Sequence, residues 1–293
     1  MRGALILVRT LGDQESLDTL ATPLQEAIRS LFSSAGAAGR EAKKLLHGSA
    51  LGHPLHPALV GLPVGAWTLA AILDAMELCG LRRDRDLADT AIRIGLLGAV
   101  ASAVAGATDW AETDGRAKRI GLLHGAINLT AATLYALALP LRRQSRSKGI
   151  ALSLSAFGLA MSSAYLGGHL AYGEQIGVDH TATADQDSPK KYVAVLDADE
   201  LKENKPKKVE ADGVPIVLVK QGDSIYALRD TCTHLGGPLS EGKIEGDAIR
   251  CPWHGSKFCP KDGRVLEGPA VFPERPFDVR VRNGRIEVRA RPQ

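Results

Sequence analysis

Four apolar segments of membrane-spanning length dominate the first part of the chain. They cover residues 57–79, 91–110, 120–141 and 150–172, and a helix needs roughly 20 apolar residues to cross the hydrocarbon core of a bilayer. The alternative is a soluble bundle, but each of its helices would need a polar face. Residues 150–172 contain no Asp, Glu, Lys or Arg. The pattern therefore predicts a four-helix transmembrane domain over residues 47–175, in contact with membrane lipid.

Small and apolar residues at helical spacing predict two further contacts of these helices. Gly98, Ser102 and Gly106 recur every four residues in the second segment, and such a stripe lets helix backbones approach closely in lipid. An amphipathic helix is expected over residues 17–46, lying on the membrane or against the first span. Residues 1–46 are thus predicted to be an amphipathic, interfacial segment.

The composition changes after the fourth segment. Residues 176–190 are polar and rich in Gly, Asp and Thr, as expected of a linker. Residues 191–293 contain short alternating runs, and Asn283-Gly284 between residues 277–282 and 285–289 is a strong hairpin signal. The predicted fold class is two-domain α + β, with a four-helix transmembrane bundle followed by an all-β domain. The formal net charge of +3 and the lack of a basic patch interleaved with aromatics argue against a nucleic-acid partner.

Two pairs of cysteine and histidine stand within the predicted β domain. They are Cys232-Thr-His234 and, after 16 intervening residues, Cys251-Pro-Trp-His254. Zinc could use the same four ligands, but zinc fingers pair Cys with Cys and His with His. One Cys and one His in each loop suit a [2Fe–2S] cluster in which both cysteines bind one iron and both histidines bind the other.

The residues around these pairs resemble the two cluster-binding loops of the Rieske family. The resemblance is carried by CTHLGGPLSEG and CPWHGSKF, followed by DGRVLEGPA, and it covers about 100 residues. It implies that Cys232, His234, Cys251 and His254 are the cluster ligands. It also implies that the backbone passes close to the cluster at Gly237, among other positions, and that the Ser256 hydroxyl can donate to a bridging sulfide.

Three positions depart from the high-potential Rieske proteins of the quinol-oxidising cytochrome bc complexes. Those proteins carry a disulfide where this chain has Gly237 and Trp253, and a tyrosine hydroxyl directed at a ligand sulfur where it has Phe258. A donor to a sulfur stabilises the reduced cluster. The reduction potential is therefore expected in the lower part of the Rieske range, roughly −150 to +300 mV. This pattern is similar to the Rieske ferredoxins and the ferredoxin-like domains of oxygenase systems.

No complete catalytic site is visible in the sequence. A non-haem iron oxygenase needs a separate site of two histidines and one carboxylate, and no residue range remains for the large domain that carries it. Whether the chain is an enzyme by itself stays open, and an oxidoreductase-associated electron carrier is expected.

The apolar half resembles a four-helix membrane family of unknown function that is often fused to Rieske domains. The resemblance rests on HGSALGHPLHPALVGLPVGAW and on later LLHGAIN and GGHLAYG elements, over residues 45–175. Four alternating spans would bring several polar side chains to one membrane face, the face from which the β domain continues. They are His53, His56, Asp109, His124, Asn128 and His169. Helix-end capping at the interface is one interpretation of this set, and a haem b or quinone site is the other.

Two arguments about sidedness conflict. Arg and Lys are more frequent in the short loops on the opposite side from the β domain, which favours that opposite side as cytoplasmic. However, a cluster assembled in the cytoplasm would need a folded-protein export route, and no twin-arginine signal precedes the first span. We give the second argument more weight and expect the Rieske domain on the cytoplasmic side of a multi-pass membrane protein.

These features together predict a membrane-anchored electron-transfer protein. It would pass single electrons between a soluble redox partner, which is a reductase or a terminal oxidoreductase, and a haem or quinone in the membrane. One alternative is an iron–sulfur subunit of a larger oxidoreductase with the helices as anchor only, and another is a redox sensor. The oligomeric state is left open.

Overall fold

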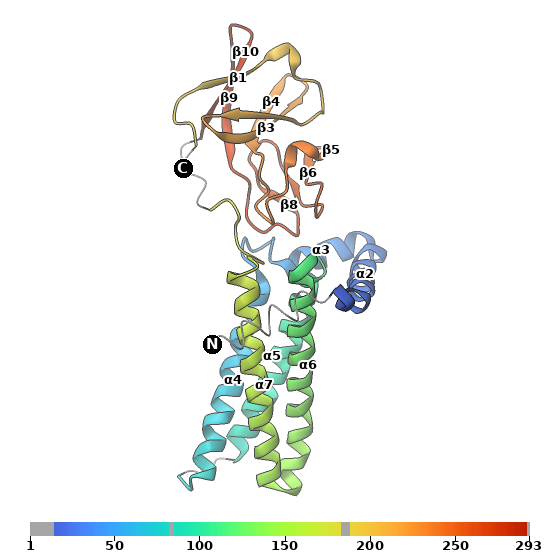
Figure 1. Cartoon of the computed structure of the whole chain (residues 1–293), viewed down its shortest axis with the longest axis vertical. Coiled ribbons are helices and arrows are strands. Elements are labelled where there is room, and N and C mark those ends of the chain that lie inside the picture. The colour runs from blue at the N-terminus through green and yellow to red at the C-terminus, as the bar shows by residue number, and fades with distance from the viewer. Residues whose placement is uncertain (1–14, 82–84, 183–187, 292–293) are drawn as a thin grey trace. The chain divides into compact units, whose positions relative to one another are not determined.

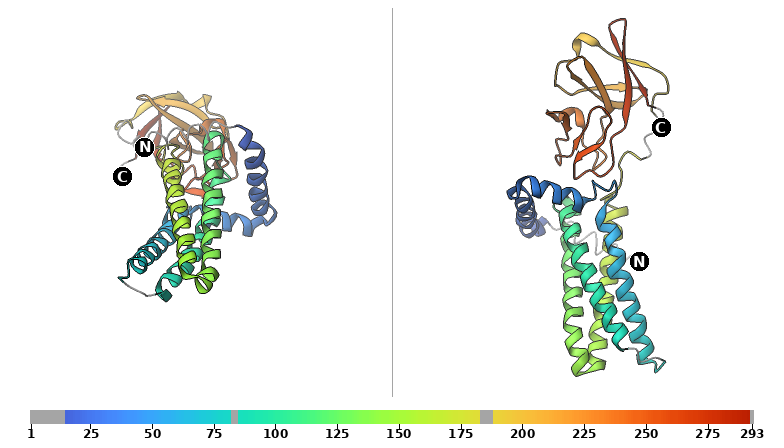
Figure 2. Two further views of the ribbon diagram at one scale, coloured as in Figure 1. Left: turned by 60° about the horizontal axis from the view of Figure 1, so that its bottom comes forward. Right: turned by 180° about the vertical axis from the view of Figure 1, so that it is seen from behind.

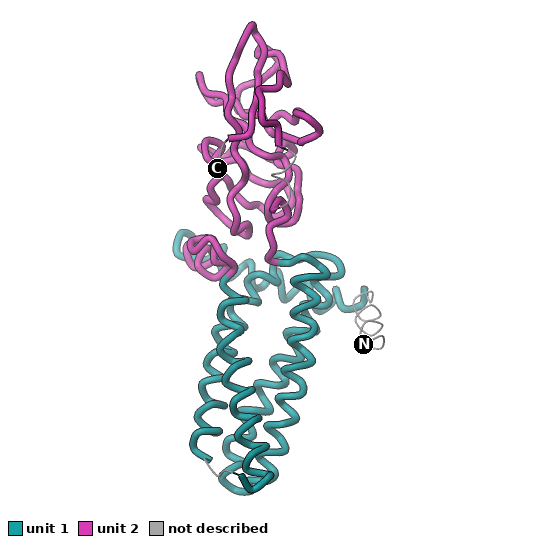
Figure 3. Tube along the Cα trace, turned by 90° about the vertical axis from the view of Figure 1, so that its left-hand side faces the viewer, with its two compact units in different colours: residues 1–39, 55–176 teal, residues 40–54, 177–293 magenta. Residues whose placement is uncertain are grey.

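The chain forms two compact units in a computed structural model that describes residues 15–81, 85–182 and 188–291 (Figure 1). One unit comprises residues 1–39 and 55–176, and the other comprises residues 40–54 and 177–293 (Figure 3). The boundary expected from the sequence between residues 1–46 and 47–175 falls inside the 40–54 segment. In the structure this segment packs with the β unit.

Four long helices make up most of the first unit. They are α4 (Leu55–Leu78), α5 (Arg85–Trp110), α6 (Gly115–Gln144) and α7 (Arg146–Tyr172), and they run side by side (Figure 2). All four are long and apolar enough to cross a membrane. Large apolar side chains such as Leu97 and Leu129 point outward with 73% and 71% of their surface exposed, which suits contact with lipid tails. The prediction of a transmembrane bundle followed by a β domain is confirmed.

The small-residue stripe of α5 packs against α4. A methyl group placed on Gly98 would lie 2.9 Å from the side chain of Pro63, and one on Gly106 would lie 2.8 Å from the His56 ring. Between them, His56 Nδ1 donates to the carbonyl oxygen of Ser102 at 2.8 Å. Because glycine lets the helices approach this closely, the imidazole can reach a backbone carbonyl of the neighbouring helix.

The predicted single helix over residues 17–46 is wrong. The chain forms a short 3₁₀ turn η1 (Glu15–Leu17), then α2 (Asp18–Ser34) and α3 (Gly36–His47). The break falls at Gly36, whose φ of 58° is left-handed and ends a helix at little cost. The buried Gln25 side chain of α2 donates to the carbonyls of Trp110 and Thr113 at 2.7 and 2.9 Å. Helix α2 therefore docks at the end of α5 and not against the first span.

A buried ion network joins the four long helices at the end where α4 finishes and α5 begins. Arg142 of α6 is fully buried and makes a two-pronged contact with Asp74 of α4. Its Nε also donates to Asp89 of α5 at 2.6 Å. Arg146 at the start of α7 donates to the same Asp89 at 2.7 Å and to Glu77 at 2.8 Å. Acidic residues inside an apolar helix are thus explained, because each one faces an arginine.

The β unit consists of two antiparallel sheets. One has the strand order β1-β10-β9-β4-β3-β2 and the other β5-β6-β7-β8. The bounds in the first are β1 (Val193–Asp197), β2 (Lys207–Ala211), β3 (Val214–Gln221), β4 (Ser224–Arg229), β9 (Pro276–Arg282) and β10 (Arg285–Ala290). Those in the second are β5 (Lys243–Glu245), β6 (Ala248–Arg250), β7 (Lys257–Phe258) and β8 (Val265–Glu267). Two short 3₁₀ helices, η2 (Ala198–Glu200) and η3 (Leu239–Glu241), complete the unit.

The turns of the larger sheet follow the sequence signals. Asn283 and Gly284 both have positive φ values, 51° and 77°, as a two-residue hairpin turn requires. Strands β9 and β10 pair in register on either side of this turn. Alternate residues face a core that includes Ile216, Leu218 and Phe277. The smaller sheet holds a second core, and its loops carry the Cys and His pairs described below.

The buried ion network yields the first prediction. Arg142→Leu leaves the buried Asp74 carboxylate without its two-pronged partner, while Asp89 keeps Arg146. We therefore expect the variant to lower the free energy of unfolding by about 3 to 5 kcal/mol. Unfolding by a denaturing detergent in mixed micelles measures this. Arg143→Leu, one position away on the exposed side of α6, is the matched control and should have little effect. An Asp74→Leu/Arg142→Leu double variant should recover much of the loss, and equal stability of Arg142→Leu and its parent would contradict the analysis.

Candidate metal centre

Two loops with the same backbone hydrogen-bond pattern carry the four predicted ligands. In the loop after β4, Gly236 N donates to Cys232 O at 2.9 Å and Cys232 N donates to Gly237 O at 2.9 Å. In the loop after β6, Gly255 N donates to Cys251 O at 3.2 Å and Cys251 N donates to the carbonyl of Ser256 at 2.8 Å. Gly236 and Gly255 have φ values of 79° and 76°, which favour glycine. Each turn therefore projects one Cys and one His from a tightly bent backbone.

The two cysteine side chains meet in the core of the smaller sheet. Cys232 and Cys251 are 1% and 3% exposed, and neither is in a disulfide. Their sulfur atoms form a hydrogen bond, which raises the pKa of Cys232 and lowers the pKa of Cys251. Backbone N–H groups of Trp253 and His254 further lower the pKa of Cys251. The site can thus hold a thiolate with little protein rearrangement.

The two histidine side chains also face each other. The ring centroids of His234 and His254 are 5.0 Å apart, with an angle of 83° between the planes. Burial lowers the pKa of His234 to about 3, and nearby cationic groups, first among them His254, act in the same direction. His234 is consequently a neutral imidazole, the form that binds a metal.

The residues around the ligands leave room for little else. A methyl group on Gly237 would lie 3.0 Å from Cys251 Sγ and 3.0 Å from the Trp253 ring. The indole of Trp253 thus covers the position where a disulfide would otherwise join the two loops. Ser256 is fully buried and its Oγ accepts a hydrogen bond from Ala270 N at 2.9 Å. Its hydroxyl proton is therefore directed elsewhere. Phe258 is fully buried in the same core as both cysteines.

A third segment, residues 271–275, holds the first loop in place, and sequence reasoning missed it. Thr233 N donates to Glu274 Oε1 at 2.7 Å, and Thr233 Oγ1 donates to the carbonyl of Phe272 at 2.8 Å. Glu274 is 1% exposed, and this burial raises its pKa well above the usual value for a carboxyl group. A glutamate in a loop with no Cys or His beside it gives no signal in the sequence. Only the fold brings it to Thr233.

These residues fit a [2Fe–2S] cluster. Nδ1 of His234 is buried with no hydrogen-bond partner, and such an atom needs one when it is withdrawn from water. Among the described residues, no three His, Cys, Asp or Glu side chains converge as a site for one metal ion. A two-iron cluster needs only two protein ligands on each iron, so two separate pairs suit it better than a four-ligand zinc site does. Cys232 and Cys251 would hold one iron, and His234 and His254 the other.

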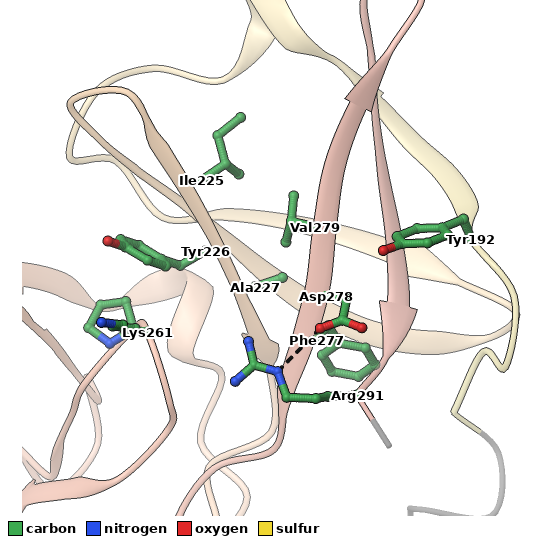
Figure 4. Close-up of a pocket in the computed structure, with 10 residues that line it drawn as sticks. Tyr192, Ile225, Tyr226, Ala227, Lys261, Phe277, Asp278, Val279 and Arg291 are labelled. Carbon is green, nitrogen blue, oxygen red and sulfur yellow. Dashed lines mark hydrogen bonds and ion pairs between the residues drawn. The ribbon is translucent and has the colours of Figure 1, made fainter. Parts of the chain in front are cut away.

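A surface pocket of about 500 Å³ lies elsewhere in the β unit (Figure 4). It opens between strands β4 and β9 and is lined by Tyr192, Tyr226, Lys261, Phe277 and Arg291, among other residues. Arg291 donates to Asp278 at 3.3 Å across its wall. None of the predicted cluster ligands lines this pocket, so it is separate from the candidate metal centre.

The helical unit holds most of the histidines predicted to share one membrane face. His124 Nδ1 donates to the carbonyl of Ser163 at 2.9 Å, and its Nε2 accepts from Asn128 at 3.1 Å. His56 and His124 each bond in this way to a carbonyl of the next helix along the chain, Ser102 of α5 and Ser163 of α7. His169 Nε2 donates to Glu174 at 3.2 Å instead.

Two more members of the predicted face have other surroundings. Asp109 lies half-buried near the end of α5. His53 belongs to the β unit and packs edge-on against Phe272. The helical unit thus holds His56, His124 and His169, and the β unit holds His53.

Comparison with known proteins matches both units of the chain. Residues 191–280 match the family described as "Rieske [2Fe-2S] domain". Residues 52–180 match the family described as "Predicted membrane protein (DUF2231)".

Several curated proteins are similar to part of the chain. Ferredoxin CarAc of Metapseudomonas resinovorans is 40% identical over 74 residues, which are 25% of this chain and 69% of that one. The ferredoxin component of biphenyl 2,3-dioxygenase from Rhodococcus jostii (strain RHA1) is 39% identical over 67 residues, 23% of this chain and 63% of that one. Apoptosis-inducing factor 3 of Homo sapiens is 30% identical over 144 residues, 48% of this chain but only 24% of its own length. The chain therefore belongs to the Rieske [2Fe–2S] family, and in it a ferredoxin-like Rieske domain follows a membrane domain of the second family.

Proposed function

We propose that this protein is a membrane-anchored one-electron carrier. It would pass electrons between a soluble redox partner and an acceptor or donor held by the helical unit. The observation that carries the proposal is the pairing of two buried cysteines with two facing histidines on loops of identical hydrogen-bond pattern. When bound there, a [2Fe–2S] cluster accepts and releases one electron at a time.

The chain's own residues position and shield such a group. The hydrogen bonds of the two turns fix the backbones of Cys232 and Cys251. The hydrogen bond from Thr233 N to Glu274 fixes the backbone next to His234. Cys232 and Cys251 are withdrawn from solvent, which keeps water and oxidants away from the sulfur side. The imidazole side lies nearer the surface, since His234 and His254 are only half-buried. Electrons would therefore enter and leave at the imidazole side.

Relatives suggest the kind of soluble partner. One ferredoxin aligned with this chain is by name the ferredoxin component of a biphenyl 2,3-dioxygenase. A reductase or a terminal oxidoreductase would play the same part here. We further propose that this domain lies on the cytoplasmic side, which protease protection in oriented vesicles would test.

The membrane end of the route is proposed to use His56 and His124. Both donate Nδ1–H to a backbone carbonyl of a neighbouring helix, and this arrangement leaves Nε2 as the nitrogen with a lone pair. It is also the way in which metal-binding histidines are commonly oriented. The Nε2 lone pair of His56 can bind a haem iron or accept a quinol hydroxyl. That of His124 accepts a hydrogen bond from Asn128 at 3.1 Å, so it can do the same once the Asn128 amide turns away.

The first test concerns the cluster ligands. Cys232→Ala and His254→Ala should each abolish a Rieske-type EPR signal of the reduced protein, because one iron loses a ligand and opens to solvent. Lys261→Ala, on an exposed loop of the same unit, should keep the full signal. One zinc and no iron per parent chain would contradict the proposal.

The second test concerns the reduction potential. Phe258→Tyr would offer a hydroxyl donor to a ligand sulfur and should raise the potential. A hydrogen bond to a charged group contributes about 1.5 kcal/mol, and a tenfold change corresponds to about 59 mV for one electron, so a rise on the order of 60 mV is expected. Protein-film voltammetry of the full chain measures it. An unchanged or lower potential would show that the ring at this position does not face a sulfur.

The third test concerns the membrane histidines. His56→Leu and His124→Leu should each slow electron transfer from the reduced cluster to a membrane acceptor at least about tenfold, since each variant loses an Nε2 lone pair. The EPR signal should persist in both. His169→Leu is the comparison, because its ring is engaged by Glu174. A haem absorption band that disappears in the variants identifies haem, and loss of quinol-dependent reduction without any such band identifies a quinone. Parent-like transfer in both variants would make the helices an anchor only.

A further inference from the structure

Residues 40–54 pack against the segment that backs the cluster-binding loops. Ser49 Oγ donates to the carbonyl of Ala270 at 2.9 Å, and the His53 ring meets Phe272 edge-on at 6.2 Å between centroids. His47 is 1% exposed. A methyl group on Gly268 would lie 2.9 Å from Ser49 Oγ and 3.3 Å from His47 Cδ2. The 40–54 segment thus makes three separate contacts along residues 268–272.

These contacts lie on the His234 side of the candidate metal centre. Residues 268–272 bond to both cluster loops, through Ala270 N to Ser256 Oγ at 2.9 Å and through Thr233 Oγ1 to the Phe272 carbonyl at 2.8 Å. Both Lys43 and His47 act electrostatically on His234. A cationic side chain of the 40–54 segment is therefore close to one of the histidine ligands.

The second segment that joins the two units, residues 177–181, also lies beside the first cluster loop. His180 N donates to the carbonyl of Thr233 at 3.1 Å, and His180 also acts on His234. A methyl group on Gly177 would lie 4.0 Å from the Pro54 ring. Both connections, residues 48–54 and residues 177–181, therefore run close together beside the first cluster loop.

The second cluster loop has a different environment. Trp253 is 57% exposed, although its indole packs on Gly237 and meets the His254 ring edge-on at 6.4 Å. The preceding Pro252 is also exposed. An exposed tryptophan beside a rigid turn is the type of residue that anchors protein interfaces. The two histidine ligands thus sit in unequal surroundings, one covered by the chain and one beside an open apolar surface.

We propose that the 40–54 segment is an intrachain cover, which closes the His234 side of the cluster site and leaves the Trp253 side open to soluble redox partners. The inference rests on the proposed electron-carrier function. Its physical basis is that other proteins cannot bind to a surface that the chain's own backbone and side chains already cover. A consequence is that Lys43, held near the cluster, favours the reduced state, which carries one more negative charge.

Hydroxyl-radical labelling of the full chain in detergent micelles tests the cover directly. In the parent, Trp253 should be oxidised and Phe272 protected. Ser49→Ala/His53→Ala removes two of the three contacts and should raise the labelling of Phe272 several-fold, with Trp253 unchanged. Leu51→Ala, at a 62% exposed position of the same segment, is the control. Equal labelling of Phe272 in the parent and the double variant would overturn the proposal, as would protection of Trp253 in the parent.

The charge of Lys43 provides a second readout. Lys43→Gln should lower the reduction potential of the full chain. Lys44→Gln should leave it near the parent value, because the charge of that side chain is balanced by Glu41 at 2.8 Å. Equal shifts in the two variants would overturn the placement of the segment. The labelling experiment reports on the cover and requires no electron transfer. The EPR experiment reports on the cluster and hence on the electron-carrier function. Failure of the one proposal can therefore be told from failure of the other.

Discussion

The convergence of the buried Cys232 and Cys251 side chains is the constraint on which the candidate metal centre depends. It exists because two turns of identical pattern end opposite each other, each closed by a bond from a glycine N–H to a cysteine carbonyl. Two thiols in a small core would otherwise contribute little. Their convergence makes the smaller sheet a holder for a metal group, and the larger sheet supplies the packed core that keeps the two turns in register.

The helical unit contains polar side chains in apolar surroundings. Polar groups within apolar helices must find partners inside the bundle. At one end Arg85, Arg142 and Arg146 balance the charges of three carboxylates. At the other end His56 and His124 bond to backbone carbonyls of neighbouring helices. The ion network neutralises its own charges, which suits a structural role. Nε2 of each histidine remains an acceptor, engaged by Asn128 in the case of His124, which suits the chemical role proposed for the pair.

Sequence patterns predicted much of this arrangement because they report local chemistry. Segment length predicts the four spans, Asn283-Gly284 predicts the hairpin, and the Cys and His spacing predicts the cluster ligands. Sequence patterns do not predict contacts between segments that are far apart in the chain. Glu274 reaches Thr233 only through the fold, and Gly36 breaks a helix whose apolar period continues on both sides. Nothing in residues 40–54 indicates a contact with residues more than 200 positions away.

The reduction potential of the centre depends on opposing effects that the structure places on different sides of it. Phe258 withholds a donor from the sulfur side, which favours the oxidised state, whereas a hydroxyl proton of Ser256 directed at a bridging sulfide would favour the reduced state. On the imidazole side the charge of Lys43 also favours the reduced state. The buried Glu274 would oppose it if ionised, but burial keeps that carboxyl protonated over a wider pH range than usual. On the proposed arrangement, the side covered by residues 40–54 would therefore shift the potential upward. Those residues directly precede α4, so the stretch of chain that leads into the membrane domain would also adjust the energy of the electron that the proposed carrier holds.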